Sequence, residues 1–474
     1  MLHINIKQTG LALLLAACLT GSASVQAAPP AGGERTTGAA VQATASTRQI
    51  PQRGQVIRTA ESATDTAEAA ASESPVKDVL LTWPHVAGAV QYQVVLLRTD
   101  SPSHEPDNLV YTMDNVNTNG CDMPLSHFGT AARSFYWQVC ALDRYGHALG
   151  KFSTPQPVSA GRFNMTAPEP NTEFDKMDYM MTYPVFAWIP QQGAWHHEVQ
   201  VFRRKMLRDD LIRTLSADEY MVYENGGYTV PGRYFWRVRA VTADGEPLSD
   251  WSRKTEFEVK APCPFAALGD SITHGGGAMS VSGASLIYDW ETYSEVPVKN
   301  IGFSGDTTQA MLNRFETDVL PFSPSVLVIM GGVNDYRGGT MGSQTVQNLI
   351  AIRDKCLTYG IVPVFLTVTP INPAYIAQSA DIETPPSDWQ AHRAYINNWI
   401  MVQRYHIDTA SALTDDQGWL RSDYTTDGLH PDYMGKKLIG EKVGRYLKDN
   451  FPWLLDRTPG KKPIPKYASS CADW

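Results

Sequence analysis

The sequence lacks three features that point to common classes of protein. Beyond residue 18 it has no apolar run long enough to span a bilayer. The formal net charge is −9, and the sequence contains no run of lysine and arginine residues, so the chain has no basic patch of the kind that binds nucleic acid. Its six cysteines include no CxxC pair and no cysteine–histidine cluster with zinc spacing. We therefore expect no nucleic-acid partner, no metal and no other cofactor.

The N-terminus has the composition of an export signal. Lys7 supplies a positive charge, and the apolar run Leu11–Ala17 that follows is too short to cross a bilayer. Two cleavage patterns compete. Leu15–Cys18 resembles a bacterial lipobox, which would leave a lipid anchor on Cys18, whereas Val25–Ala27 fits ordinary signal peptidase cleavage. Both predict a signal peptide over 1–27 and an exported protein that is extracellular, periplasmic or held at the cell surface.

The next segment, 28–76, is rich in Ala, Thr, Ser and Gly and nearly free of aromatic residues. It cannot bury enough apolar surface to offset the entropy of ordering, so we expect a disordered linker. Without Cys18, five cysteines remain, an odd number, so at least one has no disulfide partner within the chain. Cys121 with Cys140 is the first choice for a pair, because both fall in one predicted module.

A sequence repeat follows the linker. Trp83 and Trp188 each stand eleven residues before a valine in a run that alternates apolar and polar residues. Each half then contains a second aromatic run with its own tryptophan, Trp137 or Trp236. Alternation of β-branched and aromatic residues is the signal of a half-buried strand. The four tryptophans are therefore expected in cores.

This pattern resembles fibronectin type III modules over 78–162 and 166–260. The resemblance implies two all-β sandwiches, one after the other. They would either bind glycan or hold the rest of the chain away from the membrane, and the residues leave both roles open.

From Cys263 onward, apolar runs alternate with helical periodicity. This alternation is typical of a parallel sheet with helices on both faces. The predicted strands are 265–268, 298–301, 326–330 and 361–368, and the predicted helices are 308–320, 343–358, 389–404 and 435–447. Ligands bind such sheets at the carboxyl ends of the strands, so the residues just after each strand are the candidates for function.

Polar residues follow these strands. Ser271 comes after the first strand, Gly305 after the second and Asn334 after the third, while Asp427 and His430 precede the last helix. A serine hydroxyl becomes a nucleophile when a neighbouring base takes its proton, and His430 is the candidate base. Asp427 is the candidate carboxylate that holds the imidazole in the right tautomer.

Such a serine also needs hydrogen-bond donors for a tetrahedral oxyanion. The backbone N–H groups of Ser271 and Gly305 and the side-chain amide of Asn334 are the three candidates. Ser271 alone would more often be a helix N-cap, and the partners above reverse that interpretation. Asp270 and Asp335 are expected to be structural hydrogen-bond partners.

These segments, in this order, resemble the sequence blocks of the SGNH, or GDSL-type, hydrolases. Ser271 matches the block I serine, Gly305 the block II glycine, Asn334 the block III asparagine, and Asp427 and His430 the D-x-x-H of block V. The resemblance implies a flavodoxin-like, three-layer α/β/α hydrolase domain over 263–452, followed by a tail over 453–474, and ester hydrolysis without a metal. Block I reads GDSI here instead of GDSL, and no G-x-S-x-G elbow occurs.

The substrate is expected to be an ester with a short acyl group. The proline-rich loop 369–388 follows the fourth strand, so it is expected to form one wall of the site, and Trp290 and Tyr293 are candidates for its mouth. The loop shows no long apolar stretch, which favours acetyl groups on a polysaccharide or oligosaccharide. The alternatives are a lysophospholipase or thioesterase and, from another class, a non-catalytic adhesion or glycan-binding protein.

Overall fold

The structure, a computed structural model, describes residues 76–143, 145–277, 283–379 and 382–473. The predicted signal peptide over 1–27, the lipid anchor at Cys18 and all of the predicted linker except Val76 lie outside the described residues. Within these four ranges, no helix has the length and apolar character needed to cross a membrane.

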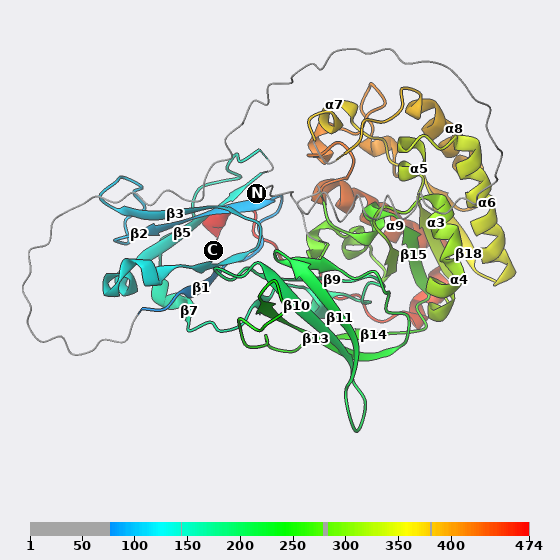
Figure 1. Cartoon of the computed structure of the whole chain (residues 1–474). Helices are drawn as coiled ribbons and strands as arrows, with labels where there is room; N and C mark the ends of the chain where they lie inside the picture. Colours follow the sequence, from blue (N-terminus) through cyan, green and yellow to red (C-terminus); the bar gives the residue numbers. More distant parts are fainter. Residues whose placement is uncertain (1–75, 144, 278–282, 380–381, 474) are drawn as a thin grey trace, which may run out of the picture. The chain divides into compact units, whose positions relative to one another are not determined.

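The first β-module, residues 76–163, consists of two sheets with the strand orders β4-β1-β7 and β3-β2-β5-β6 (Figure 1). Its strands are β1 (Val79–Thr82), β2 (Gln91–Leu97), β3 (Leu109–Val116), β4 (Gly120–Met123), β5 (Tyr136–Leu142), β6 (Gln156–Pro157) and β7 (Arg162–Phe163). Trp83 and Trp137 are buried in a core that both sheets line, as expected. The expected disulfide is wrong: Cys121 lies on β4 and Cys140 on β5, strands of different sheets, and both are buried thiols.

The second β-module, residues 166–260, repeats this arrangement with the orders β12-β9-β8 and β11-β10-β13-β14. Its strands are β8 (Glu169–Pro170), β9 (Val185–Ile189), β10 (His196–Arg203), β11 (Asp210–Asp218), β12 (Met221–Tyr223), β13 (Gly232–Val241) and β14 (Thr255–Val259). Trp188 and Trp236 are fully buried. The tryptophans thus belong to cores, while the fibronectin type III identity of the two modules stays a prediction.

The C-terminal domain contains a parallel five-stranded sheet in the order β16-β15-β17-β18-β19. Its strands are β15 (Phe265–Gly269), β16 (Lys299–Gly302), β17 (Val326–Met330), β18 (Val362–Leu366) and β19 (His406–Ile407). The four predicted strands are confirmed as β15 to β18. The fifth, β19, escaped prediction because two residues are too few to show a period.

Helices follow the strands, as the α/β alternation requires (Figure 1). They are α2 (Ser271–His274), α3 (Thr308–Asn313), α4 (Phe315–Asp318), α5 (Val333–Arg337), α6 (Gly342–Thr358), α7 (Pro373–Ile376), α8 (Trp389–Met401) and α9 (Tyr433–Asn450). The single helix predicted over 308–320 is wrong. It divides into α3 and α4 at Arg314, whose backbone leaves the helical region with φ −95° and ψ 6°.

The hydrophobic cores do not follow the domain boundaries predicted from the sequence. The first β-module has its own core. The second β-module shares one continuous core with the C-terminal domain, in which Trp188 and Trp236 belong to the same cluster as Phe265 and Ile301. Burial of this shared apolar surface favours a fixed arrangement of these two parts.

The segment after α9, predicted as a tail over 453–474, contacts both β-modules. The backbone N–H of Lys462 donates to Asp178 at 2.7 Å, and the Lys461 ammonium pairs with the same carboxylate at 2.6 Å. Ala468 donates its N–H to the carbonyl of His85 at 2.9 Å. The segment therefore ties the C-terminal domain to both modules.

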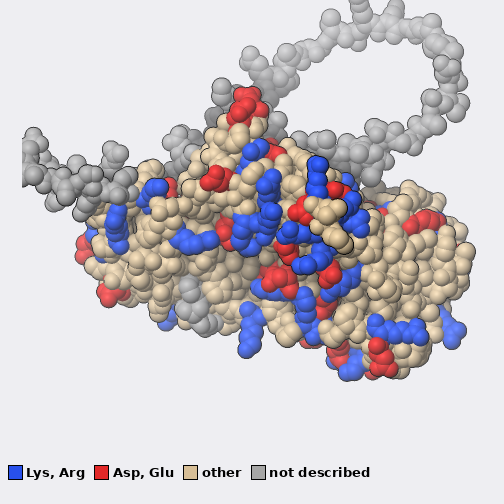
Figure 2. Space-filling model, turned by 90° about the horizontal axis from the view of Figure 1, so that it is seen from below, with Lys and Arg blue, Asp and Glu red and all other residues tan. Residues whose placement is uncertain are grey.

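Charged side chains of both signs lie interspersed on the face seen in Figure 2. On the sheet of β10, β13 and β14, Arg239 pairs with Glu198 at 2.6 Å and Arg233 with Glu256 at 3.1 Å. These two arginines therefore each have a carboxylate partner on a neighbouring strand.

Candidate active site

Ser271 lies immediately after β15, at the first residue of the short helix α2. The helix is capped by Asp270, whose Oδ1 accepts the backbone N–H of Ile272 at 3.0 Å. Because the neighbouring aspartate takes the capping role, the Ser271 hydroxyl stays available, and the residue is partly exposed. Gly269 permits this tight exit from the strand, since a Cβ there would lie 2.7 Å from the carbonyl oxygen of Met330.

The structure brings His430 to the Ser271 hydroxyl. The distance from His430 Nε2 to Ser271 Oγ is 3.0 Å, and that from His430 Nδ1 to Asp427 Oδ2 is 2.8 Å. The Asp427 carboxylate only accepts hydrogen bonds, so Nδ1 carries the proton and Nε2 accepts from the serine. This is the arrangement in which a histidine can take a proton from a serine.

Asp427 is almost fully buried and holds its position through a tight turn. Gly428 has a φ of +82°, and this turn lets Asp427 Oδ1 accept the N–H groups of Leu429 and His430, both at 2.8 Å. Burial opposes ionisation, but the neighbouring His430 and these donors outweigh it and hold the pKa of Asp427 below its ordinary value. The carboxylate therefore stays charged opposite the imidazole.

The other two candidate oxyanion donors follow the strands on either side of β15. Gly305 comes after β16, is exposed and has a φ of +87°, with open space where a Cβ would stand. Asn334 comes after β17, on α5, and its Nδ2 donates one hydrogen bond to the carbonyl of Asp306 at 2.9 Å. Since an amide nitrogen has two hydrogens, one remains for a substrate.

Asp270 and Asp335 accept hydrogen bonds from the protein interior. Asp335 accepts the backbone N–H of Thr308 at 2.8 Å, which links α5 to the start of α3. Burial raises the pKa of Asp270 to about 7. Lys436 is buried beside it and donates to the carbonyl of Ile272 at 2.6 Å, which holds α2 against α9.

One expectation for the mouth of the site is wrong. Trp290 is fully buried, and its Nε1 donates to Thr273 Oγ1 at 3.4 Å, so it packs beneath α2 instead of facing substrate. Tyr293 is also buried, and its hydroxyl donates to the carbonyl of Ile287 at 2.9 Å. Large aromatic residues go to cores more readily than to polar rims, and this signal was available in the sequence.

The loop 369–388 begins next to the turn that carries His430. The backbone N–H of Asn372 donates to the carbonyl of Gly428 at 2.7 Å. Asn372 also caps α7, within the loop. Residues 380–381 of the loop lie outside the described residues. The start of the loop therefore lies beside the turn that carries His430, where it could form one wall of the site.

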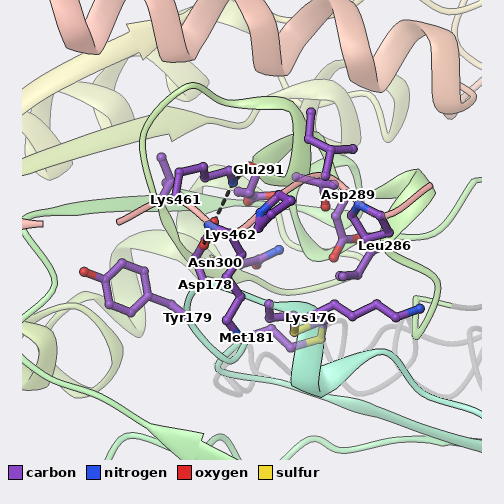
Figure 3. A pocket seen from close by; sticks show the side chains of 16 residues that line it. Lys176, Asp178, Tyr179, Met181, Leu286, Asp289, Glu291, Asn300, Lys461 and Lys462 are labelled. Atoms are coloured by element: carbon purple, nitrogen blue, oxygen red, sulfur yellow. Dashed lines mark hydrogen bonds and ion pairs between the residues drawn. The ribbon is translucent and has the colours of Figure 1, made fainter. Parts of the chain in front are cut away.

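A cavity occurs away from these residues, at the junction of the second β-module, the C-terminal domain and the final segment (Figure 3). Asp178, Asp289, Glu291, Lys461 and Lys462 are among its lining residues. None of the predicted catalytic residues lines it. Among the residues described, no group of three or more His, Cys, Asp and Glu side chains could hold a metal ion.

Sequence reasoning missed two residues beside the site, the buried His274 and the partly buried Arg314. His274 ends α2, three residues after Ser271, and hydrogen-bonds the loop that holds Gly305. Arg314 donates to the carbonyl of Gly269 at 3.1 Å and pairs with Asp306 at 2.6 Å. Neither lies in a motif, and only the spacing from Ser271 could have drawn attention to His274.

The chain is similar in sequence to a known family of hydrolases. Residues 267–438 match the family model described as the GDSL-like Lipase/Acylhydrolase family. The uncharacterized lipoprotein YqeF of Bacillus subtilis (strain 168) is 36% identical over 80 residues, which cover 16% of this chain and 33% of that relative. The chain thus spans about a third of the length of that relative.

Two solved structures illustrate the likeness. The lipase/acylhydrolase from Enterococcus faecalis is 23% identical, and the match covers 42% of this chain and 98% of that one with a TM-score of 0.33. An acetyl xylan esterase, AlAXEase, is 19% identical, with 38% and 96% covered and a TM-score of 0.30.

Proposed function

We propose that this hydrolase, whose C-terminal domain belongs to the GDSL-like lipase/acylhydrolase family, is an exported serine esterase that removes short acyl groups from carbohydrate. One observation carries the proposal: the continuous contact from Ser271 Oγ to His430 Nε2 at 3.0 Å and from His430 Nδ1 to Asp427 Oδ2 at 2.8 Å.

In the first half of the reaction, Ser271 Oγ attacks the acyl carbon while its proton passes to His430 Nε2. The tetrahedral oxyanion receives hydrogen bonds from the Ser271 and Gly305 N–H groups and from the free amide hydrogen of Asn334. The intermediate then collapses, the bond from the acyl carbon to the alcohol oxygen breaks, and the alcohol leaves with the proton held by His430.

In the second half, water attacks the acyl-serine. His430 Nε2 takes a proton from this water, and the new tetrahedral intermediate expels Ser271 Oγ, which recovers that proton. The products are a carboxylic acid and the free enzyme. The charged Asp427 stabilises the imidazolium in both halves without accepting its proton.

Support for a carbohydrate ester comes from the organisation of the chain. Two β-modules and an export signal suit a large extracellular substrate, and the loop 369–388 has no long apolar stretch to hold a fatty acyl chain. We also propose the finer assignments: a three-layer flavodoxin-like domain over 263–452, fibronectin type III folds over 78–162 and 166–260, and surface attachment through Cys18. The likeness to a lipoprotein supports the last of these.

Acetate release from a panel of acetylated polysaccharides tests this function, with nitrophenyl esters of increasing chain length beside it. We expect acetate release by the parent protein and none by Ser271→Ala. Ser343→Ala, an exposed serine on α6, is the matched control and should match the parent. A preference for acyl chains beyond about eight carbons would replace the carbohydrate substrate with a lipid. Activity in Ser271→Ala would remove the serine mechanism.

A further inference from the structure

A short segment of the second β-module, Met180–Tyr183, lies along β16, the edge strand of the parallel sheet. Thr182 donates its backbone N–H to the carbonyl of Asn300 at 3.0 Å, and the Lys299 ammonium donates to the carbonyl of Met180. Thr182 is fully buried. The segment therefore covers the open edge of β16, the strand that leads to Gly305.

The carbonyl of Tyr183 fixes the ring of His274. His274 Nε2 lies 2.5 Å from this oxygen, which can only accept, so Nε2 carries the proton. The other nitrogen, Nδ1, accepts the backbone N–H of Ser304 at 3.1 Å and lies 2.8 Å from Ser304 Oγ. A neutral imidazole thus links the second β-module to the residue before Gly305.

The hydroxyl of Tyr183 reaches the other side of the same loop. It donates to Asp318 Oδ2 at 2.6 Å, and Asp318 accepts from Arg314 at 3.1 Å. Arg314 in turn donates to the Asp306 carboxylate at 2.6 Å, and the carbonyl of Asp306 accepts the Asn334 amide at 2.9 Å. A continuous hydrogen-bonded chain therefore runs from the second β-module to a candidate oxyanion donor.

Packing supports both connections. The Phe303 ring stacks on His274 with an interplanar angle of 7° and meets the Tyr183 ring edge-on, with centroids 4.7 Å apart. The backbones of Gly302 and His274 approach too closely for a side chain at position 302, since a Cβ there would lie 2.2 Å from the backbone nitrogen of His274. The loop 303–306 is thus held by hydrogen bonds on both sides and by aromatic contact between them.

We propose that Tyr183 and His274 are positioning residues through which the second β-module sets the oxyanion donors of the esterase. The inference rests on the proposed function, because it assumes that Gly305 and Asn334 stabilise the oxyanion. It assigns the module a part in the chemical step. Misplacement of oxyanion donors weakens transition-state stabilisation and leaves ground-state binding nearly unchanged, so kcat should fall while KM stays.

Full-chain variants test the two connections separately. His274→Phe keeps the aromatic contact and removes the hydrogen bonds of both ring nitrogens. Its control is His392→Phe, because His392 also accepts a backbone N–H on Nδ1, from Gly342, on helices that do not carry the site. Tyr183→Phe removes only the hydroxyl. Its control is Tyr288→Phe, which loses a hydroxyl that joins the first β-module to the C-terminal domain.

With nitrophenyl acetate we expect kcat of His274→Phe to fall about 30-fold and that of Tyr183→Phe about fivefold, with KM within about twofold. Affinity for phenylboronic acid, which forms a tetrahedral adduct on serine, should fall in parallel. The controls should retain the parent kcat. Melting temperature and titration with a fluorophosphonate establish the folded, active fraction.

A folded His274→Phe with kcat within twofold of the parent overturns the inference, as does a loss no larger than that of His392→Phe. Should His274→Phe fail to fold, Tyr183→Phe decides, and equality with Tyr288→Phe overturns the inference. Failure of the proposed function gives a different pattern, since Ser271→Ala would then hydrolyse the same ester.

Discussion

Replacing Asp427 with asparagine should abolish most of the activity while leaving the fold intact. The asparagine Oδ1 can still accept the N–H groups of Leu429 and His430, so the turn at Gly428 is preserved. Its Nδ2, however, is a donor and would face His430 Nδ1. That nitrogen must then become the acceptor, which moves the proton to Nε2, where it faces Ser271 and prevents the imidazole from acting as a base.

A wrong tautomer of this kind costs a factor of about 10⁴ in kcat, or about 5 kcal/mol of transition-state stabilisation. The assay is kcat/KM on nitrophenyl acetate at pH 7.5 beside a urea denaturation curve. Asp432→Asn is the matched control: Asp432 caps α9 by accepting from Met434 and Gly435, and asparagine caps equally well. If Asp427→Asn keeps more than a tenth of the parent activity, the carboxylate does not set the tautomer and the proposed triad is wrong.

Two further predictions concern stability. Gly302→Ala should lower the free energy of unfolding, measured in urea, by about 3 kcal/mol, because the new Cβ would meet the backbone of His274. Gly305→Ala has open space for its Cβ and should lower the same free energy by only about 1 kcal/mol, because of the positive φ at that position; equal losses would contradict the packing. Burial lowers the pKa of His274 from 6.5 to about 4. The neutral imidazole therefore makes its full contribution to the free energy of unfolding above pH 6.5, and about 3 kcal/mol of that contribution is lost as the pH drops toward 4. His274→Phe should lack this part of the pH dependence, and an unchanged slope would refute it. The raised pKa of Asp270 acts in the opposite direction in both proteins and cancels in the comparison.

The residues at the strand ends could be predicted from sequence because a parallel sheet brings its carboxyl ends to one edge. Ser271, Gly305 and Asn334 each follow a strand whose apolar run is visible in the sequence, and the structure places those strands side by side. The contact between Ser271 and His430 follows from the same topology together with the D-x-x-H spacing. Local pattern and sheet geometry therefore sufficed for these positions.

The connections made by His274 and Arg314 could not be predicted in this way. They depend on partners far away in the chain: 91 residues separate His274 from Tyr183, and the edge contact of Thr182 with Asn300 spans 118. No periodicity records which segment covers a sheet edge. Arg314, at which the predicted helix breaks, donates to the carbonyl of Gly269, 45 residues earlier in the chain, and helix propensity does not encode such a contact.

These contacts also change where the catalytic unit begins. Composition places a boundary near residue 263, yet the core that contains Phe265 of β15 continues into the second β-module through Phe174 and Trp188. A protein cut at 263 would expose that apolar surface and the edge of β16, and it would remove the carbonyl that orients His274. The first β-module has a separate core and meets the C-terminal domain in a small cluster that contains Ile287 and Tyr288. Because the second module shares the larger core and supplies the Tyr183 carbonyl, we expect the chemical step to depend more on the second module than on the first.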